Sequence, residues 1–192
     1  MVRQQIKQAL LSFVLLSVIT GVLYPLFVTG VASVFFHDKA SGSLIYRNGA
    51  PVGSALIGQP FDGSKYFWGR LSATTPVPFN ASASSGSNLG PMNPTLRESV
   101  NKRVDALRSV DPGDQGPVPA DLVTFSASGL DPHISLAAAY YQAPRVARVR
   151  GLPQELVNAM ISRHSRGRLL GVLGEPVVNV LELNLALDAY KK

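Results

Sequence analysis

The 192-residue sequence contains no cysteine, and this absence excludes several chemistries at once. Disulfide bonds, thiolate zinc sites and a cysteine nucleophile all require that side chain. The absence leaves the compartment open, because a chain without cysteine is compatible with either side of a membrane.

The sequence also lacks the short motifs of nucleotide hydrolysis and metal binding. No Gly-x-x-x-x-Gly-Lys-Ser/Thr loop is present, and Gly63-Ser64-Lys65 is too short to surround phosphate groups in the same way. The three histidines, His37, His133 and His164, are too far apart for a His-x-x-x-His metal pair. We therefore expect no bound metal, no cofactor held by this chain, and no catalysis by the chain alone.

Charge is absent from one long segment near the amino terminus. Residues 9–36 form a run of 28 residues without Asp, Glu, Lys or Arg, and 17 of them are Leu, Ile, Phe or Val. About 20 helical residues cross a bilayer, and these side chains favour insertion by about 7 kcal/mol in total. A cleaved signal peptide is the alternative, but its apolar region usually spans only about 7 to 15 residues. We therefore expect a retained transmembrane helix.

A narrow charge bias predicts the orientation. Arg3 and Lys7 precede the apolar run with the amino terminus, whereas Lys39 and Arg47 follow it. Positive residues are enriched on the cytoplasmic side. We expect a cytoplasmic tail (residues 1–8), a transmembrane helix (residues 9–36) and one extracytoplasmic domain (residues 37–192). The sequence has no second apolar run, so the chain is not expected to form a transport pathway alone.

Residues 37–192 are predicted to form a single α+β domain. Asn48-Gly49 lies between two β-prone runs within residues 43–57 and is typical of a hairpin turn. Further strands are expected at residues 66–70, 121–126 and 177–180, and helices at residues 94–107, 135–151, 153–164 and 181–190. Residues 71–93 are rich in Ser, Ala, Thr, Asn, Pro and Gly, and we expect either a binding loop or disorder there.

The net charge of +6 is concentrated in one region. Six arginines are opposed by Glu155 alone in this region: Arg145, Arg148, Arg150, Arg163, Arg166 and Arg168. Such a patch suits an acidic protein surface, lipid headgroups or a phosphate-bearing ligand, or is an ordinary solvated face. Nucleic acid is not expected as a partner, because no stacking aromatics are interleaved with the arginines.

A second cluster of polar residues raises the possibility of hydrolysis. Ser126, Ser128, Asp131 and His133 lie within eight residues of one another, but the Gly-x-Ser-x-Gly motif of a nucleophile elbow is missing. A tight turn that leads to a helix capped by Ser135 explains the same residues. A membrane-anchored outer hydrolase that uses Ser128 and His133 stays an alternative.

Several segments, taken together, resemble the C subunit family of the Kdp-type, ATP-driven potassium uptake complex of bacteria. The resemblance covers nearly the whole chain: Tyr24-Pro25 in the apolar run, residues 53–59, Tyr66-Phe67-Trp68-Gly69-Arg70, residues 84–89, residues 126–135, Arg145-Val146-Ala147 and residues 174–188. The chain departs from the family pattern at Leu71, where proline is usual, and at Ser85, where glycine is usual.

The resemblance implies a non-catalytic accessory subunit in the bacterial inner membrane. Its partners would be a channel-like potassium-translocating subunit, a P-type ATPase subunit and a small third membrane subunit. ATP and potassium would be used by the complex. The family is described as a catalytic chaperone that raises the ATP affinity of the ATPase subunit, which we expect to occur indirectly. Direct ATP binding through the arginine patch is the alternative.

Two sets of candidate site residues follow. Small residues one helical turn apart, with a proline that could kink the helix, suggest close packing within the membrane. The transmembrane packing candidates are Ser17, Gly21, Tyr24, Pro25, Thr29 and Ser33. The partner-binding candidates in the domain are Arg70, Ser87, Asn88, Ser128, Asp131, His133, Arg145 and Arg148.

Overall fold

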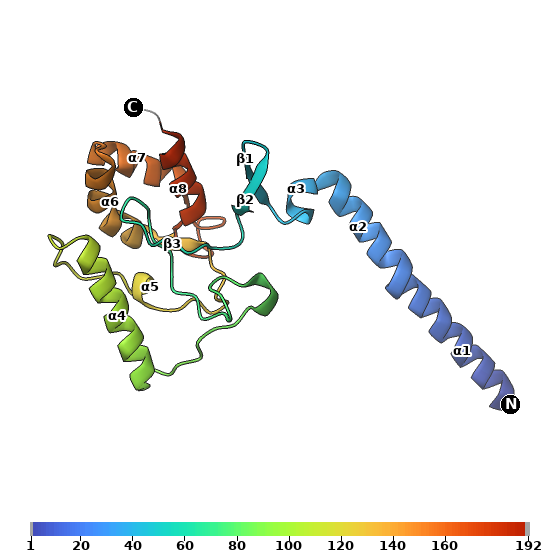
Figure 1. Cartoon of the computed structure of the whole chain (residues 1–192). Helices are drawn as coiled ribbons and strands as arrows, with labels where there is room; N and C mark the ends of the chain where they lie inside the picture. Colours follow the sequence, from blue (N-terminus) through green and yellow to red (C-terminus); the bar gives the residue numbers. More distant parts are fainter. Residues whose placement is uncertain (1, 191–192) are drawn as a thin grey trace. The chain divides into compact units, whose positions relative to one another are not determined.

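The computed structural model describes residues 2–190 and divides into two compact units, with the boundary between Leu44 and Ile45. The first unit is a long helix with a short helical extension, and the second is a domain of helices and short strands (Figure 1). The prediction of one amino-terminal apolar helix followed by an α+β domain is confirmed.

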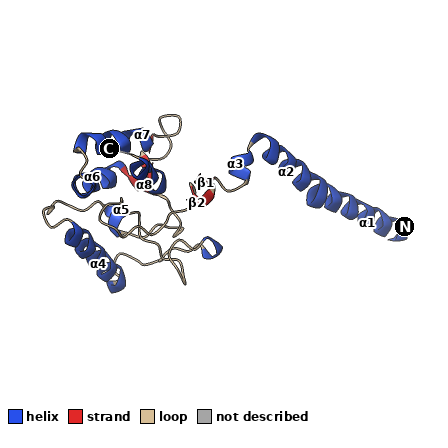
Figure 2. Ribbon diagram, turned by 45° about the horizontal axis from the view of Figure 1, so that its top comes forward, coloured by secondary structure: helices blue, strands red, loops and turns tan. Residues whose placement is uncertain are grey.

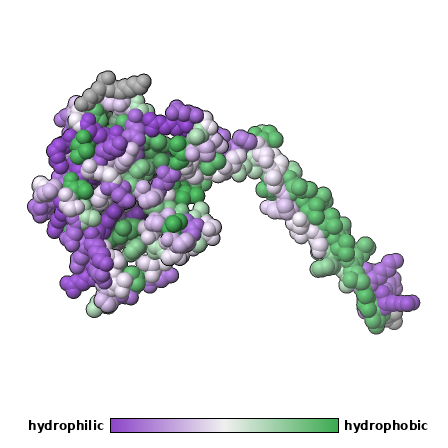
Figure 3. All heavy atoms as spheres, viewed as in Figure 1, coloured by the Kyte–Doolittle hydropathy of each residue, from purple (hydrophilic) through white to green (hydrophobic). Residues whose placement is uncertain are grey.

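The first unit is one continuous helix with a change of geometry in its middle. It consists of α1 (Val2–Val18), a π-helical turn η1 (Ile19–Leu23) and α2 (Tyr24–Phe35). Within Val2–Phe35 a window of 18 residues has a mean hydropathy of 2.2, so the helix is long and apolar enough to cross a membrane. The face of the helix seen in Figure 3 is mainly apolar, and its most hydrophilic atoms lie at the amino-terminal end. The helix begins inside the predicted tail, because residues 2–8 contain no helix breaker.

After the short helix α3 (His37–Ala40), the predicted hairpin is present as β1 (Leu44–Arg47) and β2 (Ala50–Ser54). The two turn residues, Asn48 and Gly49, have φ values of 52° and 79°. Positive φ at both positions is what a type I′ turn requires, and Asn-Gly adopts it with little strain.

Helices and loops make up most of the domain (Figure 2). The three-stranded sheet has the order β3 (His133–Ser135), β5 (Val177–Asn179) and β4 (Ser165–Arg166), with antiparallel pairing throughout. The helices are α4 (Pro94–Val110), α5 (Ala120–Val123), α6 (Leu136–Arg150), α7 (Gln154–His164) and α8 (Val180–Ala189). Side chains cap several of them as expected: Asn93 accepts from Thr95, and Ser135 from Ala138.

The core lies where α6, α7 and α8 pack around β5, with α4 and α5 adding an edge. Its fully buried apolar side chains include Phe67, Leu122, Ile134, Val146, Val157, Ile161, Val178 and Leu183. Phe67 and Trp68 come from the middle of the chain, so the core depends on contacts between distant segments.

Residues 66–70 do not form the predicted strand. Their backbone pairs with two buried side-chain amides instead of a neighbouring strand. Asn184 accepts from the N–H of Phe67 and donates to its carbonyl, at 2.9 Å each. Gln142 does the same for Trp68, at 2.8 and 3.1 Å. The prediction was wrong because aromatic content indicated an extended segment but not what its backbone would bond.

The strand predicted at residues 121–126 is also wrong. Ala120–Val123 is the short helix α5, and only Phe125 forms a bridge, with Leu71. Asp121 lies in the first turn of α5, and its carboxylate accepts from the N–H of Ser135 at 2.7 Å and from its hydroxyl at 3.1 Å. At the strand predicted for residues 177–180, Val180 instead begins α8, because Asn179 caps that helix by accepting from Glu182.

The polar segment of residues 71–93 contains one 3-10 turn, η2 (Ala81–Ala83), and bonds largely to itself. The Ser72 hydroxyl accepts from Phe79 N–H at 2.9 Å and donates to the Gly129 carbonyl at 2.7 Å. The Thr74 hydroxyl accepts from Asn80 N–H at 3.0 Å. The hydroxyls of Ser72 and Thr74 therefore hold this loop together and against residue 129.

Candidate functional site

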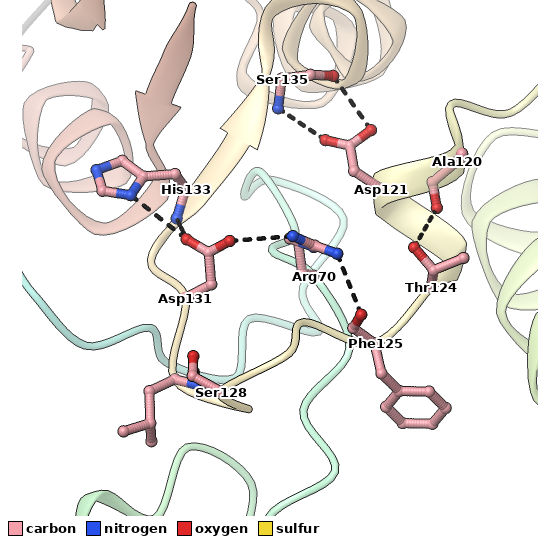
Figure 4. A network of polar contacts seen from close by, with 10 residues as sticks. Arg70, Ala120, Asp121, Thr124, Phe125, Ser128, Asp131, His133 and Ser135 are labelled. Atoms are coloured by element: carbon pink, nitrogen blue, oxygen red, sulfur yellow. Dashed lines mark hydrogen bonds and ion pairs between the residues drawn. The ribbon is translucent and has the colours of Figure 1, made fainter. Parts of the chain in front are cut away.

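Three of the partner-binding candidates form one polar cluster, Arg70, Asp131 and His133 (Figure 4). The Asp131 carboxylate lies 3.2 Å from Arg70 Nη1 and accepts from the backbone N–H of His133 at 3.0 Å. His133 Nδ1 is 3.4 Å from the same carboxylate. Arg70 also donates to the carbonyl of Phe125, which ties the cluster to the segment after α5.

Electrostatics favour the charged form of Asp131. Burial alone raises the pKa of this carboxyl, but the hydrogen bonds from His133 and Arg70 lower the pKa by more. The pKa of Asp131 therefore lies below its usual value, and the carboxylate stays ionised at a lower pH than an ordinary aspartate does. The cluster is an ionic brace between residue 70 and the turn that enters β3.

A shallow hollow of about 500 Å³ lies beside this brace and is lined by Leu56, Arg70, Ser126, Ser128 and Asp131 among others. Ser126 Oγ, Arg70 Nε and His133 Nε2 are buried without a hydrogen-bond partner. Ser128 Oγ accepts from Leu130 N–H at 3.1 Å, and no hydrogen bond joins Ser128 to His133 in the part of the chain that the structure describes.

Ser87 and Asn88 follow a stretch of chain that lies against the Ser128 turn. The Ser84 hydroxyl donates to the Ser128 carbonyl at 2.9 Å. A Cβ added to Gly86 would lie 2.7 Å from the Ala127 carbonyl, so the two segments are in close contact. Asn88 is exposed with φ of 50°. The structure thus brings five candidates into one region of the domain: Arg70, Ser87, Ser128, Asp131 and His133.

Arg145 is a correction to the sequence-based prediction. It was placed on an exposed basic patch, but its relative exposure is 2% and it lies in the core. Its guanidinium donates to the carbonyl of Tyr66 at 3.0 Å, to Gln142 Oε1 at 2.9 Å and to the carbonyl of Ser64. It also lies 5.5 Å from the ring of Trp68. Burial lowers the pKa of Arg145 to about 10. Arg145 therefore holds residues 64–68 in place and is not available to a partner.

The other arginines of the predicted patch are mostly paired with acids from elsewhere in the chain. Arg148 lies 2.7 Å from Asp111, Arg150 lies 2.9 Å from Asp188, Arg166 lies 3.0 Å from Glu182, and Arg168 lies 2.9 Å from Glu175. Of the six, Arg163 and the buried Arg145 have no ion pair among residues 2–190. Counting charges in a local window missed these partners, because all four acids lie outside residues 145–168.

Sequence reasoning also missed Gln142 and Asn184, whose amides complete the core. Both are 1% exposed. The available signal was a carboxamide inside an apolar helical face, as in Leu183-Asn184-Leu185. Such a side chain is buried only when its donors and acceptors are satisfied. No group of three or more His, Cys, Asp or Glu side chains that could hold a metal occurs among the described residues.

The membrane-packing candidates lie on either side of the π-helical turn. The N–H of Tyr24 bonds to the carbonyl of Ile19, five residues earlier instead of four. Pro25 follows directly and has no N–H to donate. A single such turn accommodates about one extra residue, so it rotates the rest of the helix by about 100°.

This rotation brings the small residues closer to one face. Ser17, Gly21, Pro25, Thr29 and Ser33 recur at every fourth position, and in a regular helix this series drifts by about 160°. The π-helical turn removes much of that drift and leaves the five within about 80°. Together they form what we call the small-residue stripe. Tyr24, the remaining candidate, lies about 100° from Pro25 and is outside it.

Comparison with known proteins gives a consistent result. The family model described as "K+-transporting ATPase, c chain" matches residues 6–189. A protein of Variovorax paradoxus (strain S110) named potassium-transporting ATPase KdpC subunit is 61% identical over 184 residues, which is 96% of this chain and 95% of the relative. Proteins of the same name from Methylibium petroleiphilum and Herpetosiphon aurantiacus are each 59% identical, covering 97% and 96% of this chain and the same shares of their own lengths. The chain therefore belongs to the family of the K+-transporting ATPase c chain.

Proposed function

We propose that this chain is a non-catalytic accessory subunit of an ATP-driven potassium uptake complex in the bacterial inner membrane. The amino terminus is cytoplasmic and the domain is extracytoplasmic. The observation that carries the proposal is a single apolar helix of 34 residues joined to a domain whose polar clusters are braces. Relatives of about 60% identity are named as subunits of a potassium-transporting ATPase.

The transmembrane helix docks against larger subunits through the small-residue stripe. Small side chains let two helix backbones approach closely, which is the main source of packing energy between helices in lipid. The proposed partners are the channel-like potassium-translocating subunit, the P-type ATPase subunit and the small third membrane subunit. The π-helical turn matters in this proposal because it sets the stripe's register.

The effect of this chain on ATP affinity is proposed to be indirect, through assembly. Four of the six arginines that suggested an ATP site are engaged in ion pairs, and Arg145 is buried. Binding a triphosphate there would require those pairs to open. Calorimetric titration of ATP into the purified full chain tests the point: we expect no heat at millimolar ATP, and a saturable signal would favour direct binding.

The outer hydrolase is the weaker candidate. Its nucleophile, Ser128, is in a turn hydrogen bond, and its base would have to be His133, whose Nε2 is buried. We expect the variant with both residues replaced by Ala to keep the functions of the complex. The exception is any function that depends on the brace, because the substitution removes the contact between His133 and Asp131.

Two insertions of equal size test the docking proposal. Inserting one alanine between Phe27 and Val28 rotates Thr29 and Ser33 by about 100° relative to Ser17 and Gly21. Inserting one alanine between Leu10 and Leu11 lengthens the helix equally but leaves the stripe's register intact. We expect the insertion after Phe27 to abolish co-purification with the other subunits and the insertion after Leu10 to preserve it. Equal recovery of complex with both variants would refute the docking role of the stripe.

A further inference from the structure

A second apolar feature lies at the tip of the connection between β4 and β5. Leu169, Leu170, Val172 and Leu173 are 67%, 86%, 76% and 59% exposed. They surround Gly171 in a tight turn, and we call residues 169–173 the apolar tip. Isolated exposed aliphatic residues are common on soluble domains, but four gathered on one protruding turn indicate a surface for interaction.

The conformation of the tip makes its composition more informative. Leu170 has φ of 54° and Gly171 has φ of 74°. Both residues are in the left-handed region. At the position of Leu170, Asn or Asp would adopt this conformation with less strain than leucine does. A highly exposed leucine thus occupies a position where both solubility and backbone geometry favour a polar residue.

Most backbone N–H groups of the tip are bonded within the tip or to its base. Leu169 N–H bonds to the Leu173 carbonyl at 2.8 Å, and Leu173 N–H bonds back to the Leu169 carbonyl at 3.0 Å. Val172 N–H also bonds to the Leu169 carbonyl, and Gly171 N–H bonds to the Arg168 carbonyl. Segments that enter the hydrocarbon core must satisfy their backbone groups internally, because the apolar phase offers no hydrogen-bond partners. The tip meets that requirement for four of its five N–H groups and for the carbonyls of Leu169 and Leu173, which suits shallow insertion only.

The base of the tip is nearly neutral. Arg168 pairs with Glu175 at 2.9 Å, and Arg166 pairs with Glu182 at 3.0 Å. The tip itself presents no side chain able to donate or accept a hydrogen bond. The surface that the tip contacts is therefore apolar, and charge does not select it.

We propose that the apolar tip inserts shallowly into the apolar edge of the lipid bilayer in which the chain is anchored. The proposal rests on the membrane anchorage in the proposed function, but not on the ATPase partners. Only eight residues separate Phe35 from Leu44 at the unit boundary, a reach of about 30 Å at most. So tethered, the domain stays at high effective concentration next to the bilayer.

A modest affinity is sufficient for a tethered domain. Each aliphatic side chain favours the apolar phase about twofold, so the four together contribute about fifteenfold. This would be too weak to recruit a free protein. For a domain already held at the surface, it is enough to place the tip in lipid most of the time.

The absence of cysteine allows a direct test. The full chain carrying Leu170→Cys is labelled with a nitroxide and reconstituted in phosphatidylcholine nanodiscs. Relaxation by oxygen, which concentrates in lipid, is compared with relaxation by a water-soluble nickel chelate. Met92→Cys serves as the matched control in the domain, because Met92 is apolar and 93% exposed. Phe13→Cys, within the span, reports on anchorage.

We expect oxygen-dominated relaxation at position 170 and nickel-dominated relaxation at position 92. Adding Leu169→Ser and Val172→Ser to the labelled chain should shift the 170 label toward water about fourfold. Unchanged Trp68 fluorescence would show that these variants are folded.

A label at 170 that is exposed to water while the label at 13 is in lipid would overturn the proposal and leave the anchorage intact. Protection that arises only when the other subunits are added would overturn it as well, and would assign the tip to a protein partner. A water-exposed label at 13 would refute the anchorage, and with it the proposal that depends on it.

Discussion

Replacing Arg145 with Met should destabilise the domain far more than a surface arginine substitution. The change removes the donors that satisfy the carbonyls of Ser64 and Tyr66, both on the segment that carries Phe67 into the core. Each buried group left unpaired costs about 1–3 kcal/mol, and the lost contact with the Trp68 ring costs about 1 kcal/mol more.

One effect acts in the opposite direction. Burial lowers the pKa of Arg145 to about 10, so holding its charge in the core is itself unfavourable, and methionine removes that cost. We expect a net loss of about 3 kcal/mol. Arg148→Met is the matched control, because its side chain is 59% exposed and its single ion pair with Asp111 is worth less than about 1 kcal/mol.

The assay is urea unfolding of the full chain in detergent micelles, followed by tryptophan fluorescence. Trp68 is the only tryptophan, and it lies beside the substituted residue. With a denaturant slope of about 2 kcal/mol per molar, Arg145→Met should lower the midpoint by about 1.5 M. A midpoint no lower than that of Arg148→Met would refute the structural role of Arg145.

Two further predictions concern the brace and the neighbouring turn. Since the pKa of Asp131 in the folded chain lies below its usual value, its stabilisation is fully present above about pH 4 and is lost as the pH falls through the folded pKa. Asp131→Asn should therefore cost about 1 kcal/mol at about pH 6 and almost nothing at about pH 2, as urea midpoints would show; equal losses at both pH values would contradict this. Gly129→Ala should lower stability by about 2 kcal/mol or more, because φ is 69° and the new Cβ would lie 2.6 Å from the Ser85 carbonyl. Gly90→Ala, where no atom lies within 4 Å, should change the melting temperature very little, and similar losses in both variants would exclude the close approach as the cause.

Features encoded by neighbouring residues could be predicted from the sequence. The apolar helix follows from its composition, the hairpin from Asn48-Gly49, and α4 from a capping Asn93 followed by Pro94. In each case a few adjacent residues fix the local backbone, and no distant partner is needed. Element boundaries were less certain, as the start of α8 at Val180 shows.

Features that depend on distant partners could not be predicted in this way. The role of Arg145 depends on carbonyls about 80 residues earlier, which lie next to it only in the folded core. The neutralisation of Arg148 and Arg150 likewise depends on Asp111 and Asp188. The π-helical turn was predicted only in part. Pro25 indicated a kink in the helix, but the sequence alone did not predict a π-helical turn or its effect on the register of the small-residue stripe.

The pairing of residues 67 and 68 with side-chain amides also constrains when the domain can fold. Phe67 is bonded to Asn184, 117 positions later, and Trp68 to Gln142, 74 positions later. A nascent chain that has not yet exposed α8 therefore has no partner for the backbone of Phe67. If the domain is translocated as proposed, its core closes only after α8 has been translocated, and a chain shortened before α8 would be a substrate for quality-control proteases.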